Sequence, residues 1–292
     1  MMDYLKNMKK NNNDFIDYNM YNPFLLKGME DALYRIVKAV NDREKIILYG
    51  FYNVDSITAI SLLMLVLKFV NADVEYFIPG ETCESYDLNE KDITGHIKYL
   101  VPGLIITLGC GINSFNEIEL CKSMGIDVII TDFHEPIKQV PDTIVVNPKQ
   151  KGCNYPFKGL CASGMTFKLA QAISSYYKMK SINKYMDLVM IGTISSKVKL
   201  VGENKIFAEE GVKSLNCTNN YGICALLKTH NIEFIDEETV SKLVLAVMPT
   251  INAVGRMDNA KILVELFITS DKNRALQISK YLDKELKNSL IF

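Results

Sequence analysis

Short apolar runs alternate with amphipathic stretches through the first half of the chain. The runs are four or five residues long and end at polar or glycine-containing loops, as at 46–49, which Gly50 follows. Strands buried on both faces are apolar throughout, whereas the helices beside them are apolar along one side. The alternation therefore predicts an α/β fold, a doubly wound and mainly parallel sheet with flanking helices. The expected strands are 46–49, 74–78, 104–108, 128–131 and 143–146.

The expected helices follow from apolar residues at three- and four-residue spacing. The first covers about 25–40, with Pro23 suited to its first turn, and the next covers 56–70. Ser114, with Glu117 three residues later, is a capping-box signal for another helix. The pattern becomes mostly helical after Asn147-Pro148, so we expect a helical C-terminal part. Its clearest predicted helices are 160–177, 186–194 and 238–247.

Functional groups of a parallel sheet gather in the loops beyond the carboxyl ends of its strands. Here those loops are 50–56, 79–88, 108–113 and 131–136. The Asn- and Lys-rich start of the chain has too little apolar surface to offset its ordering entropy, which predicts a mobile tail. We therefore expect three parts, which are a tail at 1–21, an α/β domain at 22–260 and a connecting helix at 261–292.

Composition narrows the class of protein. Hydrophobic residues make up 48% of the 292 residues, which is enough for a large core. The formal net charge of −1 gives no overall attraction to a phosphate backbone, so any nucleic-acid affinity must be local. Seven cysteines without a CxxC pair argue against a disulfide framework and a zinc site, and favour a reducing cytoplasm. No stretch approaches the ~20 apolar residues of a membrane helix, so no membrane association is expected.

Several strand-end loops carry compact motifs of glycine, aspartate and histidine. The loop after the first strand reads Tyr49-Gly50-Phe51-Tyr52-Asn53-Val54-Asp55-Ser56. The next two motifs are Gly109-Cys110-Gly111-Ile112 and Asp132-Phe133-His134-Glu135-Pro136. Further along come Gly192-Thr193-Ile194-Ser195-Ser196 and Asn252-Ala253-Val254-Gly255-Arg256.

In order and spacing, from about Asn22 onward, these motifs resemble those of RecJ-type DHH phosphoesterases. The resemblance implies a DHH-type α/β domain that cleaves phosphodiesters with a pair of Mn²⁺ or Mg²⁺ ions. It also implies a connecting helix and a second domain. The helix-like stretch 273–290 resembles the start of that connector, and the second domain is expected to be absent.

The chain departs from the family pattern at ligand or near-ligand positions. Hard divalent cations need carboxylates with some imidazole. The residues at five such positions supply neither, and only Asp55, Asp132 and His134 remain as metal candidates. We therefore expect no cofactor, or at most one weakly bound Mn²⁺ or Mg²⁺. The degenerate positions are Phe51, Asn53, Gly109, Phe133 and Ser196.

Two of the replacements are aromatic. Phe51 and Phe133 are predicted to fill part of the former metal cavity together, from two adjacent strand ends. A crowd of carboxylates without cations to neutralise it would repel itself, so neutral replacements relieve that cost.

The retained polar residues have structural alternatives. Asp55 follows a strand and precedes a helix, where an Asp more often caps that helix than binds a metal. His134 could take a hydrogen-bonded structural role or contact a phosphate. Arg256 could bind a phosphate or pair with Asp258. Asp132 is expected to orient loop backbone.

Three functions fit these residues. The first is a catalytically inactive RecJ-like domain that binds single-stranded nucleic acid or a DNA-replication or repair protein. The second is an active metal-dependent phosphoesterase, either a single-stranded DNA 5′–3′ exonuclease or a nucleotide phosphodiesterase, with ligands from unexpected positions. The third is a truncated or decaying gene product without a selected role.

Overall fold

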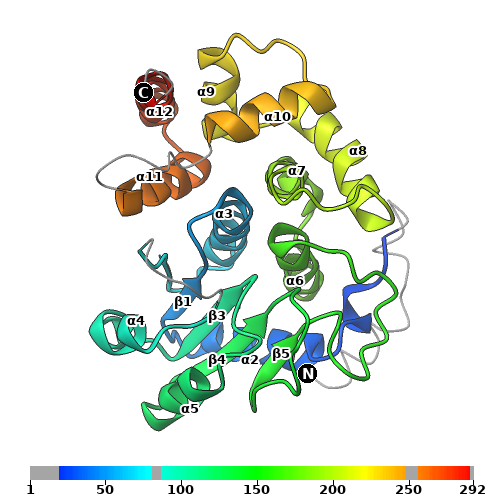
Figure 1. The fold of residues 1–292 in the computed structure, drawn as a ribbon, viewed down its shortest axis with the longest axis vertical. Coiled ribbons are helices and arrows are strands. Elements are labelled where there is room, and N and C mark those ends of the chain that lie inside the picture. The colour runs from blue at the N-terminus through cyan, green and yellow to red at the C-terminus, as the bar shows by residue number, and fades with distance from the viewer. Residues whose placement is uncertain (1–19, 81–86, 248–255, 290–292) are drawn as a thin grey trace.

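A five-stranded parallel sheet forms the centre of the N-terminal half (Figure 1). The computed structural model describes residues 20–80, 87–247 and 256–289. The strand order is β2-β1-β3-β4-β5, and every neighbouring pair is parallel. The predicted doubly wound α/β fold is therefore confirmed. The strands are β1 (Ile46–Tyr49), β2 (Val74–Phe77), β3 (Leu104–Leu108), β4 (Asp127–Thr131) and β5 (Ile144–Val146).

Alternate side chains of each strand enter two hydrophobic clusters on opposite faces of the sheet. In β1, Ile46 and Leu48 belong to the larger cluster, whereas Ile47 and Tyr49 belong to the smaller one. Both faces are covered, which explains why the central strands β1 and β3 are almost entirely apolar, whereas the edge strand β2 carries Glu75. Helices α2 (Met29–Asn41), α3 (Val54–Phe69) and α6 (Ala162–Tyr177) pack on the first face, and α4 (Glu90–Gly95) and α5 (Phe115–Ser123) on the second.

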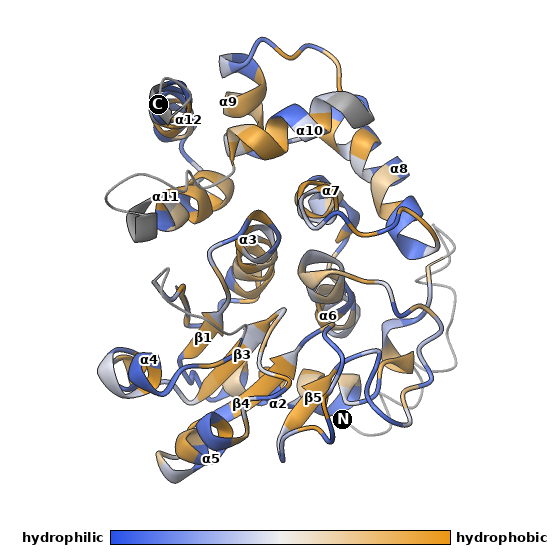
Figure 2. Cartoon of the chain, viewed as in Figure 1, coloured by the Kyte–Doolittle hydropathy of each residue, from blue (hydrophilic) through white to orange (hydrophobic). Residues whose placement is uncertain are grey.

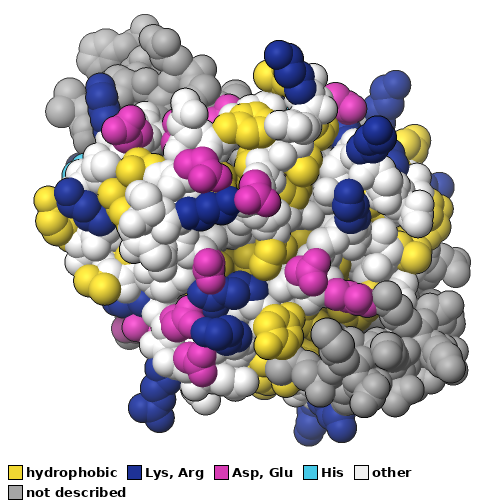
Figure 3. All heavy atoms as spheres, turned by 90° about the horizontal axis from the view of Figure 1, so that it is seen from below, with side chains coloured by type: hydrophobic (Ala, Val, Ile, Leu, Met, Phe, Trp, Pro, Cys, Tyr) yellow, Lys and Arg dark blue, Asp and Glu magenta, His cyan; other side chains and the backbone are white. Residues whose placement is uncertain are grey.

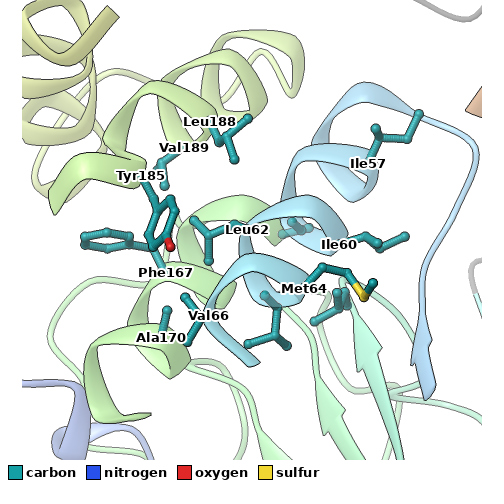
Figure 4. Packing of buried hydrophobic residues seen from close by; sticks show 14 of the residues in the cluster. Ile57, Ile60, Leu62, Met64, Val66, Phe167, Ala170, Tyr185, Leu188 and Val189 are labelled. Carbon is teal, nitrogen blue, oxygen red and sulfur yellow. The ribbon is translucent and has the colours of Figure 1, made fainter. Parts of the chain in front are cut away.

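Helix α3 lies at the centre of the larger cluster. Its apolar residues surround the helix on all sides, and nearly all of them are buried. Leu62 and Val66 of α3 face Phe167 of α6 and Tyr185, and Leu188 of α7 lies above them (Figure 4). A helix that is apolar all round has to be enclosed by other elements. Here the enclosing elements are the sheet, α6, α7 (Met186–Ser195) and α11 (Arg256–Ile268).

The remaining helices extend away from the sheet and form the expected helical C-terminal part (Figures 1 and 2). Helix α8 (Glu203–Asn216) packs on α7, and α12 (Lys272–Ser289) packs on α9 (Tyr221–Thr229). Helix α12 covers most of the stretch 273–290 that was predicted to be helical. Among the described residues, no helix combines the length and the apolar character needed to cross a bilayer. The other helix is α10 (Glu237–Ala246), and the 3₁₀ turns are Pro23–Leu25, Ile97–Leu100 and Asn183–Tyr185.

One predicted helix start and one predicted helix cap differ from the structure. Pro23 begins a 3₁₀ turn rather than the first long helix, which starts at Met29 after Gly28 turns the chain with a φ of 81°. The predicted capping box at Ser114 is not formed. The Ser114 hydroxyl instead accepts a hydrogen bond from the Leu88 backbone N–H at 2.9 Å. Ser114 therefore joins two strand-end loops rather than closing its own helix.

The first described residues are fixed to the helices. Met20 is buried, and the Tyr21 backbone N–H donates to Glu203 at 3.0 Å. The sequence placed both residues in the mobile tail, whose other residues, 1–19, lie outside the described part. Met20 and Tyr21 are therefore held by contacts with the rest of the chain.

Candidate functional site at the carboxyl ends of the strands

Asp132, at the end of β4, organises the loops at this edge of the sheet. Its side chain is fully buried. Oδ2 accepts from the Ile112 backbone N–H at 3.0 Å, which holds the loop after β3. Oδ1 accepts from the backbone N–H groups of Phe133 and His134 at 2.7 and 3.1 Å, and lies 2.7 Å from the His134 Nδ1. The prediction that Asp132 orients loop backbone agrees with the three backbone contacts.

His134 is the half-exposed polar group of the site. Its ring stacks on Phe133 with centroids 4.2 Å apart and the planes inclined by 30°. The hydrogen bond to Asp132 raises the pKa of His134, against an opposing contribution from burial. The His134 carbonyl also accepts from the Asn147 side-chain amide at 2.9 Å. The imidazole is therefore oriented by Asp132 and Phe133, while part of its ring remains in contact with solvent.

Asp87 is a site residue that the sequence reasoning did not single out. It is half-buried, and one oxygen accepts from the Asn113 N–H and the Ser114 hydroxyl, both at 3.4 Å. Burial raises the pKa of Asp87, and the charge of Asp132 raises it further. The sequence could have indicated Asp87, because it is an acidic residue in the strand-end loop 79–88.

Asp55 caps a helix, but a different one from the helix predicted. Its buried carboxylate accepts from the backbone N–H groups of Ala162 and Ser163, both at 2.8 Å, at the start of α6. Asn53 instead caps α3, accepting from the Ser56 N–H at 2.8 Å. An Asp on the first turn of one helix therefore satisfies the free N–H groups of a second helix.

Gly109 leaves no room for a carboxylate. Its φ is 79°, which L side chains rarely adopt. A Cβ built there would lie 2.6 Å from the Cβ of Ala162 and 3.3 Å from Phe133. The first of these distances is too short for two carbon atoms. Ala162 and Phe133 thus occupy the space that a side chain at 109 would require.

The other replaced positions have structural duties as well. Phe51 is buried beside Tyr49, with ring centroids 6.1 Å apart in an edge-to-face arrangement. The Ser196 hydroxyl donates to the Gly192 carbonyl of its own helix at 2.8 Å. Neither the Phe51 ring nor the Ser196 hydroxyl therefore offers a free charged oxygen or imidazole nitrogen to a metal ion.

The expectation that Phe51 and Phe133 lie on adjacent strand ends is wrong. Phe51 follows β1 and Phe133 follows β4, and β3 runs between those strands. Phe51 belongs to the smaller hydrophobic cluster, whereas Phe133 packs against the larger one. The alternation of side chains across the sheet sends the two aromatics to different faces.

The retained residues do not assemble a larger ligand set. Among residues 20–80, 87–247 and 256–289, no three His, Cys, Asp or Glu side chains are placed to hold one metal ion. Arg256 begins α11, but its side chain lies outside the described residues, as does that of Asp258. The choice between a phosphate contact and an ion pair for Arg256 therefore stays a prediction.

Comparison with known proteins identifies the family and the fold. The profile described as "DHH family, N-terminal domain" matches residues 45–193, about half of the chain. The chain is 38% identical over 271 residues to the single-stranded-DNA-specific exonuclease RecJ of Bacillus subtilis, covering 92% of this chain and 34% of that protein. It is 31% identical over 278 residues to the RecJ of Haemophilus influenzae, covering 91% of this chain and 48% of that protein. The chain thus spans between a third and a half of these curated relatives.

Solved structures show the same RecJ-type fold. A crystal structure of exonuclease RecJ bound to manganese superposes with a TM-score of 0.80 at 25% identity, over 90% of this chain and 66% of that one. RecJ from Thermus thermophilus in complex with Mn²⁺ superposes with a TM-score of 0.76 at 25% identity, over 90% of this chain and 38% of that one. Both of these proteins were crystallised with manganese, so the residues of the strand-end loops in this chain can be judged by whether they could bind such an ion.

Proposed function

The chain belongs to the DHH family and is a RecJ-like DHH domain, and from that premise we propose that it does not cleave phosphodiesters and instead binds single-stranded nucleic acid. The observation that carries the proposal is the filling of the strand-end site. Gly109 cannot accept a side chain without moving Ala162 or Phe133, and Asp55 is committed to the start of α6.

The side chains present do not fit a pair of divalent ions. Each ion needs several oxygen or imidazole ligands, and paired ions need carboxylates that reach both. Asp132 already accepts from three backbone N–H groups and contacts the His134 ring. Asn53 and Ser196 use their side-chain oxygens in local helix bonds. No catalytic step through a metal is therefore assigned to this site.

The polar groups at the site edge suit a phosphate backbone better than a cation. His134 is half-exposed, and Lys149 lies close enough for its charge to oppose the rise in the pKa of His134 that Asp132 causes. Lys197 and Lys199 are exposed directly after α7. The face of the molecule seen from below mixes basic and acidic side chains (Figure 3), so an attraction to DNA has to come from such local groups. The curated relatives are named as exonucleases specific for single-stranded DNA, which favours that strand as the ligand.

The cysteines support a reducing location. The six described ones are free thiols and form no disulfide with one another. We place the protein in the cytoplasm, where single-stranded DNA is exposed during replication and repair.

Three measurements on one preparation test the proposal. The protein is dialysed against Mn²⁺ and its metal content determined, end-labelled single-stranded DNA is incubated with it, and binding of the same strand is followed by fluorescence anisotropy. We expect far less than one ion per chain, no shortening of the strand, and binding that weakens as salt is raised. The double variant Lys197→Gln, Lys199→Gln should weaken binding several-fold, and Lys205→Gln, on the exposed side of α8, should not.

An active phosphoesterase is the second candidate, and Asp87 is the observation that favours it. Asp87 brings a third acidic or imidazole group into electrostatic range of Asp132 and His134. Under this alternative, Mn²⁺-dependent shortening of the strand appears and is lost in His134→Gln, whose unfolding in urea is measured alongside to check that the fold is kept. That result would replace the proposal above. A strand that neither binds nor shortens, together with a co-purifying replication or repair protein, would favour a protein-binding module.

A further inference from the structure

The side-chain amide of Asn204 joins two loops at the start of α8. Asn204 is 1% exposed, and its Nδ2 donates to the Gly159 carbonyl at 2.8 Å and to the Lys199 carbonyl at 3.0 Å. Gly159 lies in the loop before α6, and Lys199 lies in the loop between α7 and α8. One buried side chain therefore holds together two segments from different parts of the chain.

The amide of Asn204 acts through its two donors. Its Oδ1 is buried and accepts no hydrogen bond from the described residues, a state that costs free energy in a folded protein. Both N–H groups of Nδ2, by contrast, are used on loop carbonyls. The contribution of Asn204 is therefore the fixing of loop backbone.

The loop between α7 and α8 presents basic side chains from a fixed backbone. Lys197 and Lys199 are both exposed. The Lys197 N–H donates to the Ile194 carbonyl of α7 at 3.2 Å, and the Lys199 carbonyl accepts from Asn204. The segment 196–202 contains no acidic residue that could neutralise the two ammonium groups. The loop is thus held at both lysines and presents positive charge.

The other loop reaches the strand-end site. Lys158, which directly precedes the glycine held by Asn204, donates its ammonium to the Pro148 carbonyl. The next residue after Pro148 is Lys149, whose charge acts on His134. The contact made by Asn204 therefore connects the α7–α8 loop, through a short series of contacts, to the segment that borders the candidate site.

We infer that Asn204 is a positioning residue for the binding of single-stranded nucleic acid, because it sets the place of Lys197 and Lys199 relative to the strand-end site. The inference rests on the proposed function. Binding immobilises side chains and loops at a cost in entropy, and a backbone that is already fixed lowers that cost. Asn204 itself touches no ligand, since its side chain is buried between the two loops.

Limited trypsin digestion measures the positioning without any nucleic acid. Trypsin cuts after Lys197 and Lys199 when the loop opens, so the rate reports the free energy of local opening. The reference is cleavage after Lys180, which is exposed in the loop that follows α6. We expect Asn204→Ala to raise the relative rate at the two lysines several-fold.

Asn216→Ala is the matched control at the other end of α8. The Asn216 side chain exchanges two hydrogen bonds with the Ile235 backbone, at 2.9 and 3.0 Å, so it also fixes a loop. It lies about 18 Å along the helix from Asn204. The control should change neither the relative cleavage after Lys199 nor the binding of a strand.

Fluorescence anisotropy with single-stranded DNA at several salt concentrations tests the role in binding. Each phosphate contact contributes about 0.7 to the slope of log K against log salt concentration for a single strand. We expect Asn204→Ala to weaken binding several-fold and to lower this slope by about 0.7–1.4, as the loss of one or two contacts would. In the Lys197→Gln, Lys199→Gln background, Asn204→Ala should have no further effect, which a merely structural role would not produce.

The outcomes separate the inference from the proposed function. A wild-type protein that binds no strand contradicts the proposed function, and the inference falls with it. If the wild type binds, an unchanged salt slope in Asn204→Ala, or a loss that adds fully to that of the lysine double variant, overturns the role of Asn204 alone. Unchanged trypsin cleavage overturns the positioning whatever the binding.

A shorter polar substitution keeps the test decisive if Asn204→Ala does not fold. The hydroxyl of Asn204→Ser is a single donor and cannot serve both carbonyls. This variant should show the same changes in cleavage and in salt slope, and wild-type values of both would overturn the inference.

Discussion

The carboxylate of Asp55 accepts a 2.8 Å hydrogen bond from the backbone N–H of Ser163, 108 residues further along the chain. A second bond, from the Ala162 N–H, completes the arrangement. The start of α3 is thereby joined to the start of α6, and an acidic residue that resembles a metal ligand in sequence holds two helices together. Because such contacts stabilise the fold, substitutions at the site can be studied through their effect on the free energy of unfolding.

Replacing Asp55 should cost stability whether or not metal is present. Asp55→Ala leaves two buried N–H groups without a charged acceptor, which we expect to cost roughly 2–4 kcal/mol of unfolding free energy. Urea denaturation with and without Mn²⁺ measures this. Asp42→Ala, at an exposed ion pair with Lys38, is the control and should change little. A large loss seen only in the presence of Mn²⁺ would indicate that Asp55 is a metal ligand.

Restoring the family aspartate at 109 should damage the fold rather than restore a metal site. Gly109→Asp imposes a left-handed backbone on a residue with a side chain and drives its Cβ against Ala162. We expect a loss of about 2–4 kcal/mol in urea denaturation. Gly125→Asp is the matched control, because Gly125 has a φ of 73° but nothing within 4 Å of an added Cβ. Equal losses at the two glycines would show that the packing at 109 is loose.

Asp187 should make stability depend on pH in an identifiable window. Its pKa is raised from 3.8 to about 6, so between these values the folded protein keeps a proton that the unfolded chain has released. Stability from this group is therefore highest near pH 4 and falls by on the order of 2–3 kcal/mol as the pH rises through 6. The difference in unfolding free energy between wild type and Asp187→Asn, at pH 4.5 and 7.5, should shift by that amount. The exposed Asp142→Asn variant should show no such shift, and a pH-independent difference at Asp187 would contradict the raised pKa.

The buried ion pair of Lys168 and Glu203 should be costly to break on one side only. The two side chains are 0% and 1% exposed and lie 2.5 Å apart. Burial lowers the pKa of Lys168, opposed by the charge of Glu203. Lys168→Met leaves a buried carboxylate unpaired, which we expect to cost roughly 3–5 kcal/mol.

The double variant Lys168→Met, Glu203→Gln should recover most of that loss, because it removes both charges. Chemical denaturation of the single and double variants gives the comparison. The exposed pair Lys205–Glu209, treated the same way, should contribute less than about 0.5 kcal/mol. A double variant no more stable than the single one would show that the hydrogen bonds of Glu203, rather than its charge, determine the cost.

The strands could be predicted almost to the residue because burial on both faces leaves a mainly apolar signature, which is strongest in β1 and β3. β1 and β3 match the expected ranges, and β4 differs from its range by one residue. The family resemblance read from the motifs is likewise confirmed. These features depend on local sequence, which is why sequence reasoning reaches them.

Long-range partners are beyond the same reasoning. Asp55 was expected to cap the helix that follows it, because nothing local shows that Ala162 would be delivered to its carboxylate. Ser114 showed a capping-box spacing, but its hydroxyl bonds Leu88, 26 residues away. The contacts of Asp87 with the loop after β3, and the separation of Phe51 from Phe133, depend on the order of the strands in the sheet. The sequence does not determine that order.

The contact between Tyr21 and Glu203 has a consequence for synthesis on the ribosome. The Tyr21 N–H donates to Glu203, 182 residues away, and the Tyr21 carbonyl accepts from Lys168, 147 residues away. At roughly 5–20 residues per second, the segment around Tyr21 leaves the ribosome on the order of 10–40 s before Glu203 does. During that interval Tyr21 has no native partner in α8, so chaperones have time to bind this segment. A fusion tag placed before Tyr21 would be synthesised before the part of α8 on which the segment docks.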